Sequence, residues 1–432
     1  MKRVPLLFLI LGWLLLVGCG GDSTTNESAT GVPDGPEVTE PAEAQPTAAE
    51  ATGEPTAAEA TGEPTIVPTE TEAITDDEAS SRYFASPEYG MQAFMWWRPE
   101  VADRDLGLIR DAGFGWVKQD FAWREIEGAE KGAFDWSRTD TIVDMTERFG
   151  INVLARVDRQ PAWATGGQCA EGIAMGPPDN LSDFTDFLTE LATRYKGRIK
   201  AYSIWNEPNL AREWCDEAPD PAAYMELLKL SYEAIKAVDP DAIVISAGLT
   251  PTGGPMPTAM EDTEFLRGMY AAAGGTLDGY ADVLGAHAPG FKAPPELSPD
   301  EVMADQETWG RGRYFTFRRV EDLRAIMEEN GDTERQIAIL EMGWTTDPRP
   351  DSPYNWHAVT EAEKADYLVR AYAYAEENWS PWIGLMSLIY VCNYDWTPDD
   401  EQYYWCINAP SYPENLLYPS YYALQAMPKQ SE

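Results

Sequence analysis

Residues 201–208 read AYSIWNEP, an apolar stretch that runs directly into an Asn-Glu pair and stops at a proline. The apolar part predicts a buried strand over Ala201–Trp205, since proline cannot continue a hydrogen-bonded ladder. Residues 337–344 read IAILEMGW and repeat the arrangement, with Glu341 directly after a strand predicted over Ile337–Leu340. If these strands belong to a parallel barrel, both carboxylates lie at the carboxyl ends of the strands, where the chemistry of such a fold is expected.

Outward from these two stretches, short apolar runs alternate with amphipathic patterns. Six further strands are predicted, over 90–95, 116–121, 152–157, 243–247, 283–287 and 385–391. A helix is expected to begin near Pro99, and others are expected over 139–149, 182–195, 221–238, 263–273, 318–330, 361–378 and 420–427. This alternation predicts the α/β class and a (β/α)8 TIM barrel over 83–432. A doubly wound open sheet is the alternative, but no glycine-rich phosphate fingerprint follows the first strand.

Composition restricts the partners of the chain. The 432 residues carry a formal net charge of −41, so nucleic acid is an unlikely partner, because binding phosphates needs clustered Lys and Arg. The acidity is compatible with an extracellular protein and a neutral substrate. With only two His, a multi-histidine metal site is not expected, and no cofactor is implied. The oligomeric state cannot be read from the sequence.

The first 19 residues have the features of a lipoprotein signal peptide. Lys2 and Arg3 precede an apolar run over 6–17, which is too short to span a bilayer comfortably, and the segment closes with Gly18-Cys19. The end of this run resembles the bacterial lipobox, in which the cysteine is acylated. We therefore expect Cys19 to carry a lipid that holds the protein on the outer, extracytoplasmic face of the cell membrane or envelope. An ordinary secretory signal or an uncleaved anchor is the alternative.

Residues 20–82 are expected to be a disordered acidic linker. Residues 20–81 hold 15 Asp or Glu and no Lys or Arg, and the nonapeptide PTAAEATGE at 46–54 is repeated at 55–63. Such a segment buries too little apolar surface to offset the entropy lost on ordering. Proline and like-charge repulsion favour extended conformations, as in a stalk or a simple spacer.

Four cysteines remain beyond the predicted lipid site. In an oxidising compartment they allow three pairings. We expect Cys392 to pair with Cys406, which closes a short loop. Cys169 and Cys215 would then join two loops on one rim of the barrel.

The two strand-end carboxylates are expected to face each other across the barrel mouth, an arrangement that suits glycoside hydrolysis. Glu207 would be the acid/base, with a pKa raised by burial and by its negative neighbour, and Glu341 the nucleophile. Asn206 would donate to the sugar 2-hydroxyl. Carboxylates close enough to exclude water between them and the sugar would act with retention. A capping role for Glu207 and a strand-end salt bridge for Glu341 are the structural alternatives.

The region from about residue 89 to residue 400 resembles the clan A glycoside hydrolases, whose catalytic glutamates end strands four and seven. The segments WNEP (205–208) and LEMGW (340–344) look most like family 39 and its relatives, which include endoglycosidases acting on bacterial exopolysaccharide. The segments AGFGWVK (112–118), FAW (121–123) and IE (126–127) support the same resemblance. Family 5 is the second candidate. The resemblance implies the same roles for Glu207 and Glu341.

One motif departs from this family pattern. Clan members often carry His-Pro-Tyr or a similar motif after strand six, where this chain has His287-Ala288-Pro289-Gly290. His287 would orient Glu341 or bind sugar, or be a structural histidine. Tyr390 or Tyr394 would replace the missing tyrosine from strand eight.

Aromatic and charged residues near the predicted strand ends suggest a sugar cleft. Pyranose faces stack on aromatic rings, and the candidates are Trp96, Trp97, Trp123, Trp163, Trp344 and Trp396. For any single Trp, core packing is an equal alternative. Polar and charged residues also lie at the ends of strands two and three, where they would bind sugar hydroxyls or form an ion-pair layer. They are Lys118, Gln119, Asp120, Arg156, Asp158 and Arg159.

The sequence thus favours a retaining glycosidase that acts on an extracellular polysaccharide or oligosaccharide by double displacement. Xylan, glucan, mannan and exopolysaccharide are candidate substrates, and endo and exo action both remain open. A transglycosylase would share every catalytic residue. A polysaccharide-binding lipoprotein without activity is the alternative outside enzymes, and a metal-dependent hydrolase has little support.

Overall fold

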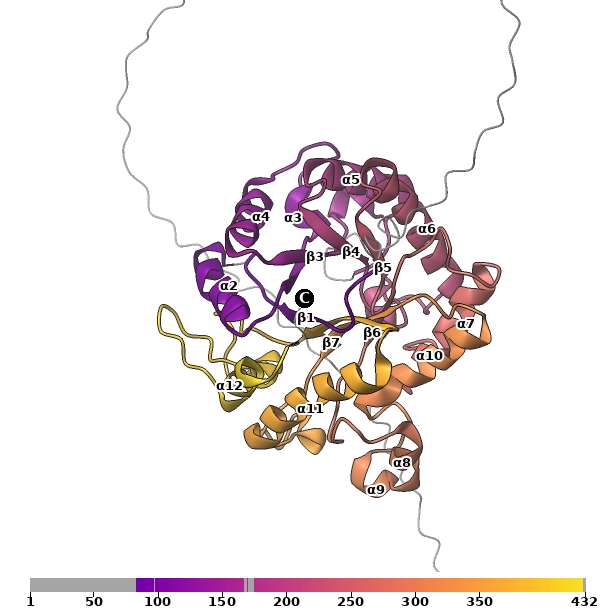
Figure 1. The fold of residues 1–432 in the computed structure, drawn as a ribbon. Coiled ribbons are helices and arrows are strands. Elements are labelled where there is room, and N and C mark those ends of the chain that lie inside the picture. Colours follow the sequence, from indigo (N-terminus) through magenta and orange to yellow (C-terminus); the bar gives the residue numbers. More distant parts are fainter. Residues whose placement is uncertain (1–82, 97, 167–168, 170–174, 430–432) are drawn as a thin grey trace, which may run out of the picture. The chain divides into compact units, whose positions relative to one another are not determined.

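Eight parallel strands lie side by side in the order β5-β4-β3-β2-β1-β8-β7-β6 in the computed structural model (Figure 1), which describes residues 83–96, 98–166, 169 and 175–429. The strands are β1 (Glu88–Gln92), β2 (Trp116–Asp120), β3 (Asn152–Val157), β4 (Ile199–Ile204), β5 (Ile243–Ser246), β6 (Leu284–His287), β7 (Ile337–Met342) and β8 (Ile383–Leu388). Parallel bridges from Ile245 to Val283 and from Leu249 to Ala286 close the gap between β5 and β6. The predicted (β/α)8 barrel is confirmed. The predicted signal peptide, Cys19 and the acidic linker lie outside the described residues.

Helices surround the barrel between successive strands (Figure 1). The longer ones are α2 (Ala102–Asp111), α4 (Ser137–Phe149), α5 (Leu181–Arg194), α6 (Pro221–Val238), α7 (Asp262–Ala272), α10 (Val320–Glu329), α11 (Glu361–Trp379) and α12 (Pro419–Ala426). Short elements in the loops were not predicted; they include α3 (Trp123–Ile126), α8 (Pro299–Ala304), α9 (Gln306–Trp309), η5 (Ala211–Glu213) and η8 (Gln402–Trp405).

The helix ends carry the signals that define them in the sequence. Asp220 caps α6 by accepting hydrogen bonds from the backbone of Ala222 and Ala223, and Pro221 occupies the first turn. Thr360 and Glu363 form a capping box at the start of α11. Gly150 ends α4 with a φ of 69°, a left-handed conformation that glycine adopts without steric cost.

Successive side chains along each strand point to opposite faces of the sheet, so the buried side chains form two cores. One set packs between the sheet and the helices and includes Val117, Val153 and Tyr202. The alternate positions form a second cluster inside the barrel: Phe84, Trp116, Leu154, Ala201, Ile243, Ile245, Val283, Ala338, Leu340 and Leu385. Phe84 packs edge-on against Trp116, so an aromatic ring fills the amino-terminal end of the barrel.

The inward positions become polar towards the carboxyl ends of the strands. Two residues beyond the apolar layer stand Lys118 on β2, Arg156 on β3, Ser203 on β4 and Ser387 on β8, all of them buried. The same alternation that fills the base with apolar side chains therefore places charges and hydroxyls below the mouth of the barrel.

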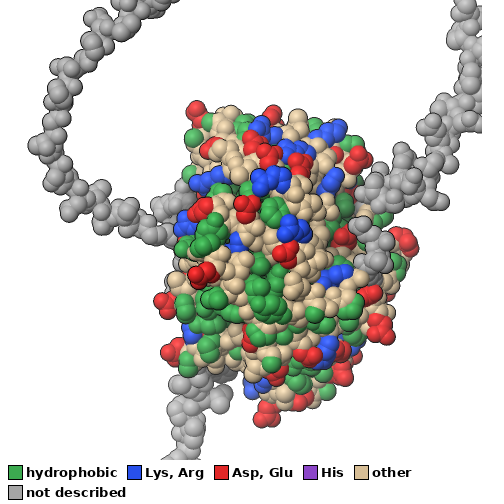
Figure 2. Space-filling view, turned by 60° about the vertical axis from the view of Figure 1, so that its left-hand side comes forward, with side chains coloured by type: hydrophobic (Ala, Val, Ile, Leu, Met, Phe, Trp, Pro, Cys, Tyr) green, Lys and Arg blue, Asp and Glu red, His purple; other side chains and the backbone are tan. Residues whose placement is uncertain are grey.

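Charge on the outside of the barrel is mixed. On the face drawn in Figure 2, Asp and Glu side chains are scattered among Lys and Arg. Among the described residues, no helix combines the length and the apolar character needed to cross a bilayer.

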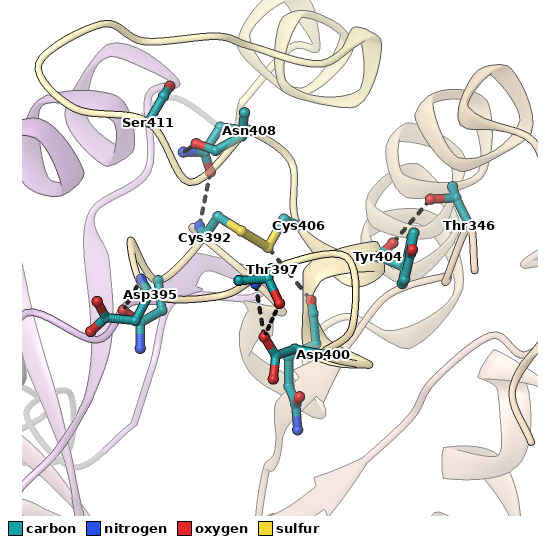
Figure 3. The surroundings of a disulfide bond; sticks show 12 residues. Thr346, Cys392, Asp395, Thr397, Asp400, Tyr404, Cys406, Asn408 and Ser411 are labelled. Atoms are coloured by element: carbon teal, nitrogen blue, oxygen red, sulfur yellow. Dashed lines mark hydrogen bonds between the residues drawn. A yellow bond between two sulfur atoms is a disulfide. The ribbon is translucent and has the colours of Figure 1, made fainter. Parts of the chain in front are cut away.

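Both expected cysteine pairs are joined in the structure, Cys169 to Cys215 and Cys392 to Cys406. Figure 3 shows the second disulfide, which closes a loop within the segment after β8, and the Cys392 N–H, which donates to Asn408 Oδ1 at 2.9 Å. Thr346, in the segment after β7, donates from its N–H to the carbonyl of Tyr404 at 3.1 Å. The loop between the two cysteines is thus fixed at both of its ends.

We predict that Tyr224→Phe lowers the free energy of unfolding by about 1–3 kcal/mol, because it leaves a buried amide without a partner. The Tyr224 hydroxyl donates to the carbonyl of Ile204 at 3.0 Å and accepts from the Ala247 N–H at 2.6 Å, so α6 links the ends of β4 and β5. Urea unfolding measures the change. Tyr422→Phe, on an exposed ring, is the control and should be close to neutral. Equal stability of the two variants would contradict this account.

Candidate active site

Glu207 stands three residues beyond the end of β4, in a tight backbone turn. Trp205 and Glu207 both have positive φ, at 72° and 41°, an unusual conformation for residues with a Cβ. Two contacts hold the turn: Trp205 Nε1 donates to the carbonyl of Glu213 at 2.9 Å, and the Glu207 N–H donates to the carbonyl of Gly248 at 3.1 Å. The turn directs the buried Glu207 carboxylate into the mouth of the barrel.

Glu341 is the second-last residue of β7, and its carboxylate faces cations from β2 and β3. Lys118 Nζ donates to Glu341 Oε1 at 2.7 Å, and Arg156 Nη1 lies 3.9 Å from the same oxygen. Oε2 accepts no hydrogen bond from a described residue. One oxygen of this carboxylate is therefore held while the other stays available.

His287 connects the two carboxylates. Its Nδ1 lies 3.0 Å from Glu207 Oε1 and 3.8 Å from Glu341 Oε2. Gly248 makes room for the imidazole, since a Cβ at that position would lie 2.2 Å from the ring. A ring nitrogen of His287 and one oxygen of each glutamate all lie within 4.8 Å of one another. The structure thus brings together Glu207, Glu341 and His287, as the sequence predicted.

The electrostatics of Glu207 differ from the expectation. Burial acts to raise its pKa, but Arg212, whose Nη2 lies 2.5 Å from Oε2, and His287 outweigh burial, and the pKa is lowered. The prediction of a raised pKa is therefore wrong for this structure, because the sequence did not reveal the cation beside Glu207. For Glu341, burial is likewise outweighed by Lys118 and then by His287, so its pKa is also lowered.

Sequence reasoning missed Arg212 and Glu213 on η5. Arg212 Nε lies 3.4 Å from Glu213 Oε1, and Glu213 is buried. Burial, opposed by Arg212 and reinforced by Glu207, raises the pKa of Glu213 to about 8. This environment favours the protonated form of Glu213. Only their spacing after the WNEP segment could have drawn attention to these residues, and spacing does not show the direction of a loop.

Three of the predicted stacking tryptophans are core residues. Trp96, Trp123 and Trp344 expose 1%, 0% and 0% of their surface. Trp123 Nε1 donates to Glu127 Oε2 at 2.7 Å, and Trp344 Nε1 donates to the carbonyl of Ala293 at 2.9 Å. Their faces are covered by protein, so the expectation that they stack on sugar is wrong.

The other predicted aromatics keep part of their surface. Tyr390 and Trp396 lie with Phe94 in one cluster, in which the ring centroids of Tyr390 and Trp396 are 5.0 Å apart. Burial, followed by the charge of Glu341, raises the pKa of Tyr390, so its hydroxyl stays protonated beside the site. Trp163 is half-buried. Tyr394 is exposed, and Trp97 lies outside the described residues.

Of the remaining polar candidates, one is available to a ligand and the others make structural contacts. The Asn206 amide is buried and makes no hydrogen bond to a described residue, so it is free for a ligand. Gln119 Oε1 accepts from the Met95 N–H at 2.9 Å and is structural. The others form the ion-pair layer: Arg156 lies 2.6 Å from Asp158, and Arg159 lies 3.0 Å from Asp120.

Glu207, His287 and Glu341 are also the one grouping among the described residues with the spacing of metal ligands. Lys118 and Arg212 already compensate the two carboxylates. This set suits carboxylates that act directly on a substrate.

Comparisons with known proteins find sequence similarity to glycoside hydrolases. A family model described as "Cellulase (glycosyl hydrolase family 5)" matches residues 77–271. A curated protein named "Beta-xylosidase" from Geobacillus stearothermophilus is 26% identical over 232 residues, which cover 48% of this chain and 44% of that protein. The chain thus spans less than half the length of this curated relative.

Two solved structures of family 39 glycoside hydrolases share the fold. The enzyme from Bacteroides cellulosilyticus superposes with a TM-score of 0.57 at 21% identity, covering 79% of this chain and 63% of that one. The enzyme from Xanthomonas axonopodis pv. citri gives 0.55 at 15% identity, covering 80% and 67%. Xylanase 10B of Thermotoga petrophila gives 0.52 at 14% identity, covering 83% and 98%. Over residues 77–271 the chain is thus similar in sequence to family 5 glycoside hydrolases, and it shares the barrel fold of the family 39 enzymes.

Proposed function

We propose that this protein is a retaining glycosidase in which Glu207 is the acid/base and Glu341 the nucleophile. The observation that carries the proposal is the approach of the two carboxylates, with one oxygen of each within 4.8 Å. Retaining enzymes place the two groups about 5–5.5 Å apart, whereas inverting enzymes need a wider gap of about 6.5–9.5 Å to admit water.

In the first step, Glu341 Oε2 attacks the anomeric carbon while Glu207 gives its proton to the glycosidic oxygen. The attacking oxygen has no hydrogen-bond donor among the described residues, whereas Lys118 holds the other oxygen and keeps the carboxylate ionised. The bond to the leaving sugar breaks as the glycosyl–Glu341 ester forms. In the second step, Glu207 takes a proton from water, which attacks the same carbon and releases the sugar with its original configuration.

Neighbouring groups supply the binding contacts. Asn206, adjacent to Glu207, has a free amide for the sugar 2-hydroxyl, a contact that strengthens as positive charge develops on the ring. Tyr390 stays protonated and can donate to Glu341 or to a sugar oxygen. Tyr390 and Trp396, which keep part of their surface, are proposed to bind a pyranose face.

We propose a β-linked extracellular polysaccharide or oligosaccharide as the substrate class. The curated relative is named a β-xylosidase, so β-xylosides and xylan are the first compounds to test. Reducing-end release by residues 83–432, on a panel that also holds glucans, mannans and bacterial exopolysaccharides, identifies the sugar.

We predict that Glu341→Gln lowers kcat by at least about three orders of magnitude without unfolding the protein, because the nucleophile is lost. The measurement is sugar release beside circular dichroism. Glu334→Gln, an exposed glutamate before β7, is the matched control and should keep full activity.

Azide separates the two roles. With Glu341→Ala it should give a glycosyl azide of inverted configuration, and with Glu207→Ala one of retained configuration. Substantial turnover by Glu341→Gln, or exchanged azide products, would overturn the assignment.

We predict that Lys118→Met moves the acidic limb of the kcat/KM–pH profile to higher pH. Lys118 lowers the pKa of Glu341, so its removal raises that pKa, and the nucleophile is then ionised only at higher pH. Lys131→Met, which removes an exposed lysine outside the site, should leave the profile unchanged. An unmoved acidic limb in Lys118→Met would argue against Glu341 as the ionised group.

We also propose that a lipid on Cys19 anchors the protein on the outer, extracytoplasmic face of the membrane or envelope. Cys19→Ala should move the protein from the membrane fraction to the soluble fraction of producing cells. Equal membrane association of both forms would contradict the anchor.

A further inference from the structure

Arg212 lies on the side of Glu207 that faces away from the nucleophile. His287 Nδ1 lies 3.0 Å from Glu207 Oε1 and 3.8 Å from Glu341 Oε2, while Arg212 Nη2 donates to Glu207 Oε2 at 2.5 Å. In a retaining site the acid lies beside the glycosidic oxygen, and the leaving sugar extends away from the nucleophile. Arg212 therefore adjoins the place of the leaving sugar.

Most donors of this guanidinium are unused. Arginine has five N–H donors in a planar fork. Among the described residues, the one hydrogen bond of the Arg212 guanidinium goes to Glu207, and its buried Nε has no hydrogen-bond partner. The side chain is 38% exposed. Nε faces Glu213 Oε1 at 3.4 Å, so the room for a second acceptor is at Nη1, which makes no hydrogen bond to a described residue.

The backbone that carries Arg212 is fixed on both sides. The Ala211 N–H donates to the carbonyl of Thr258 at 2.9 Å, and Cys215 is joined to Cys169. The Cys215 N–H donates to the carbonyl of Met175 at 2.6 Å. The backbone of η5 is thus held in place, and the Arg212 side chain alone would move from Glu207 to a second acceptor.

Several titratable groups surround Glu207: Arg212 and Glu213 on η5, His287 on β6, Glu341 on β7, Tyr354 before η7 (Asn355–His357), and Tyr390 after β8. Arg212 and His287 are the groups that favour the ionised form of Glu207. An acid held in this form cannot protonate a leaving oxygen. A substrate must therefore weaken at least one of these contacts before the first step.

We propose that Arg212 binds a carboxylate on the leaving sugar, as in a hexuronic acid residue, and that this binding draws Arg212 from Glu207 and frees Glu207 to take up its proton from solvent. The proposal rests on the glycosidase function above and names its substrate class as an acidic glycan. Guanidinium binds carboxylates through two parallel hydrogen bonds, so a substrate carboxylate competes directly with Glu207. Because the protein is acidic overall, an anionic sugar needs such a local cation.

Paired aryl glycosides of the sugar identified by the panel test this proposal. One of each pair has a meta- or para-carboxyphenyl leaving group, and the other has the uncharged carboxamide at the same position. The wild type should prefer a carboxylate over its amide by about tenfold or more in kcat/KM, and Arg212→Gln should abolish the preference. Arg212→Lys should retain part of it, because lysine keeps the charge without the fork. Arg138→Gln, on an exposed arginine, is the control.

The pH profile provides a second readout that a purely structural role would not change. With the uncharged amide, Arg212→Gln should move the basic limb of kcat/KM to higher pH, because Glu207 loses a cation and its pKa rises. Thermal unfolding confirms that each variant is folded. If the ratio of kcat/KM for the carboxylate to kcat/KM for the amide is equal in the wild type and in Arg212→Gln, this proposal is overturned, while the proposed glycosidase function stands. Absence of turnover on every glycoside and polysaccharide would instead overturn the proposed function.

Discussion

Two carboxylates with one oxygen of each within 4.8 Å, Glu207 buried and Glu341 partly buried, repel each other, and the mouth of this barrel is organised around that repulsion. Lys118 and Arg156 rise from β2 and β3 beneath Glu341, and Arg212 reaches Glu207 from the loop after β4. His287 lies between the two glutamates. These cations lower the pKa of both carboxylates and so favour their ionised forms. In the proposed mechanism Glu207 needs a proton, so substrate binding would have to weaken at least one of its cation contacts.

The scaffold supplies these cations through strand alternation. On β2, Trp116 fills the barrel interior and Lys118 follows on the same face; on β3, Leu154 is followed by Arg156 in the same way. The register pairs Lys118 with Leu154 and Asp120 with Arg156, yet both cations reach the level of Glu341 Oε1, at 2.7 and 3.9 Å. The apolar layer below excludes water and strengthens every interaction at that level.

The loops decide the electrostatics of Glu207. Arg212 lies on a segment fixed by the Cys169–Cys215 disulfide and by hydrogen bonds to the segment after β5. The Cys392–Cys406 disulfide fixes the loop that carries Trp396 (Figure 3). The two disulfides thus lie in rim segments, one of which carries Arg212 and the other Trp396.

The sequence alone determined the barrel, its strand positions to within a few residues and the pair Glu207 and Glu341, because strand periodicity and strand-end carboxylates are local patterns. The expected cysteine pairs also agree with the structure, since few partners were available. Only the tertiary structure decided whether each tryptophan is buried. Trp123 and Trp344 follow strands, as Trp396 does, yet they pack into the core. The pKa of Glu207 was likewise set by Arg212, whose side chain folds back across a loop. Burial and charge depend on neighbours brought together in space, and a linear pattern does not contain them.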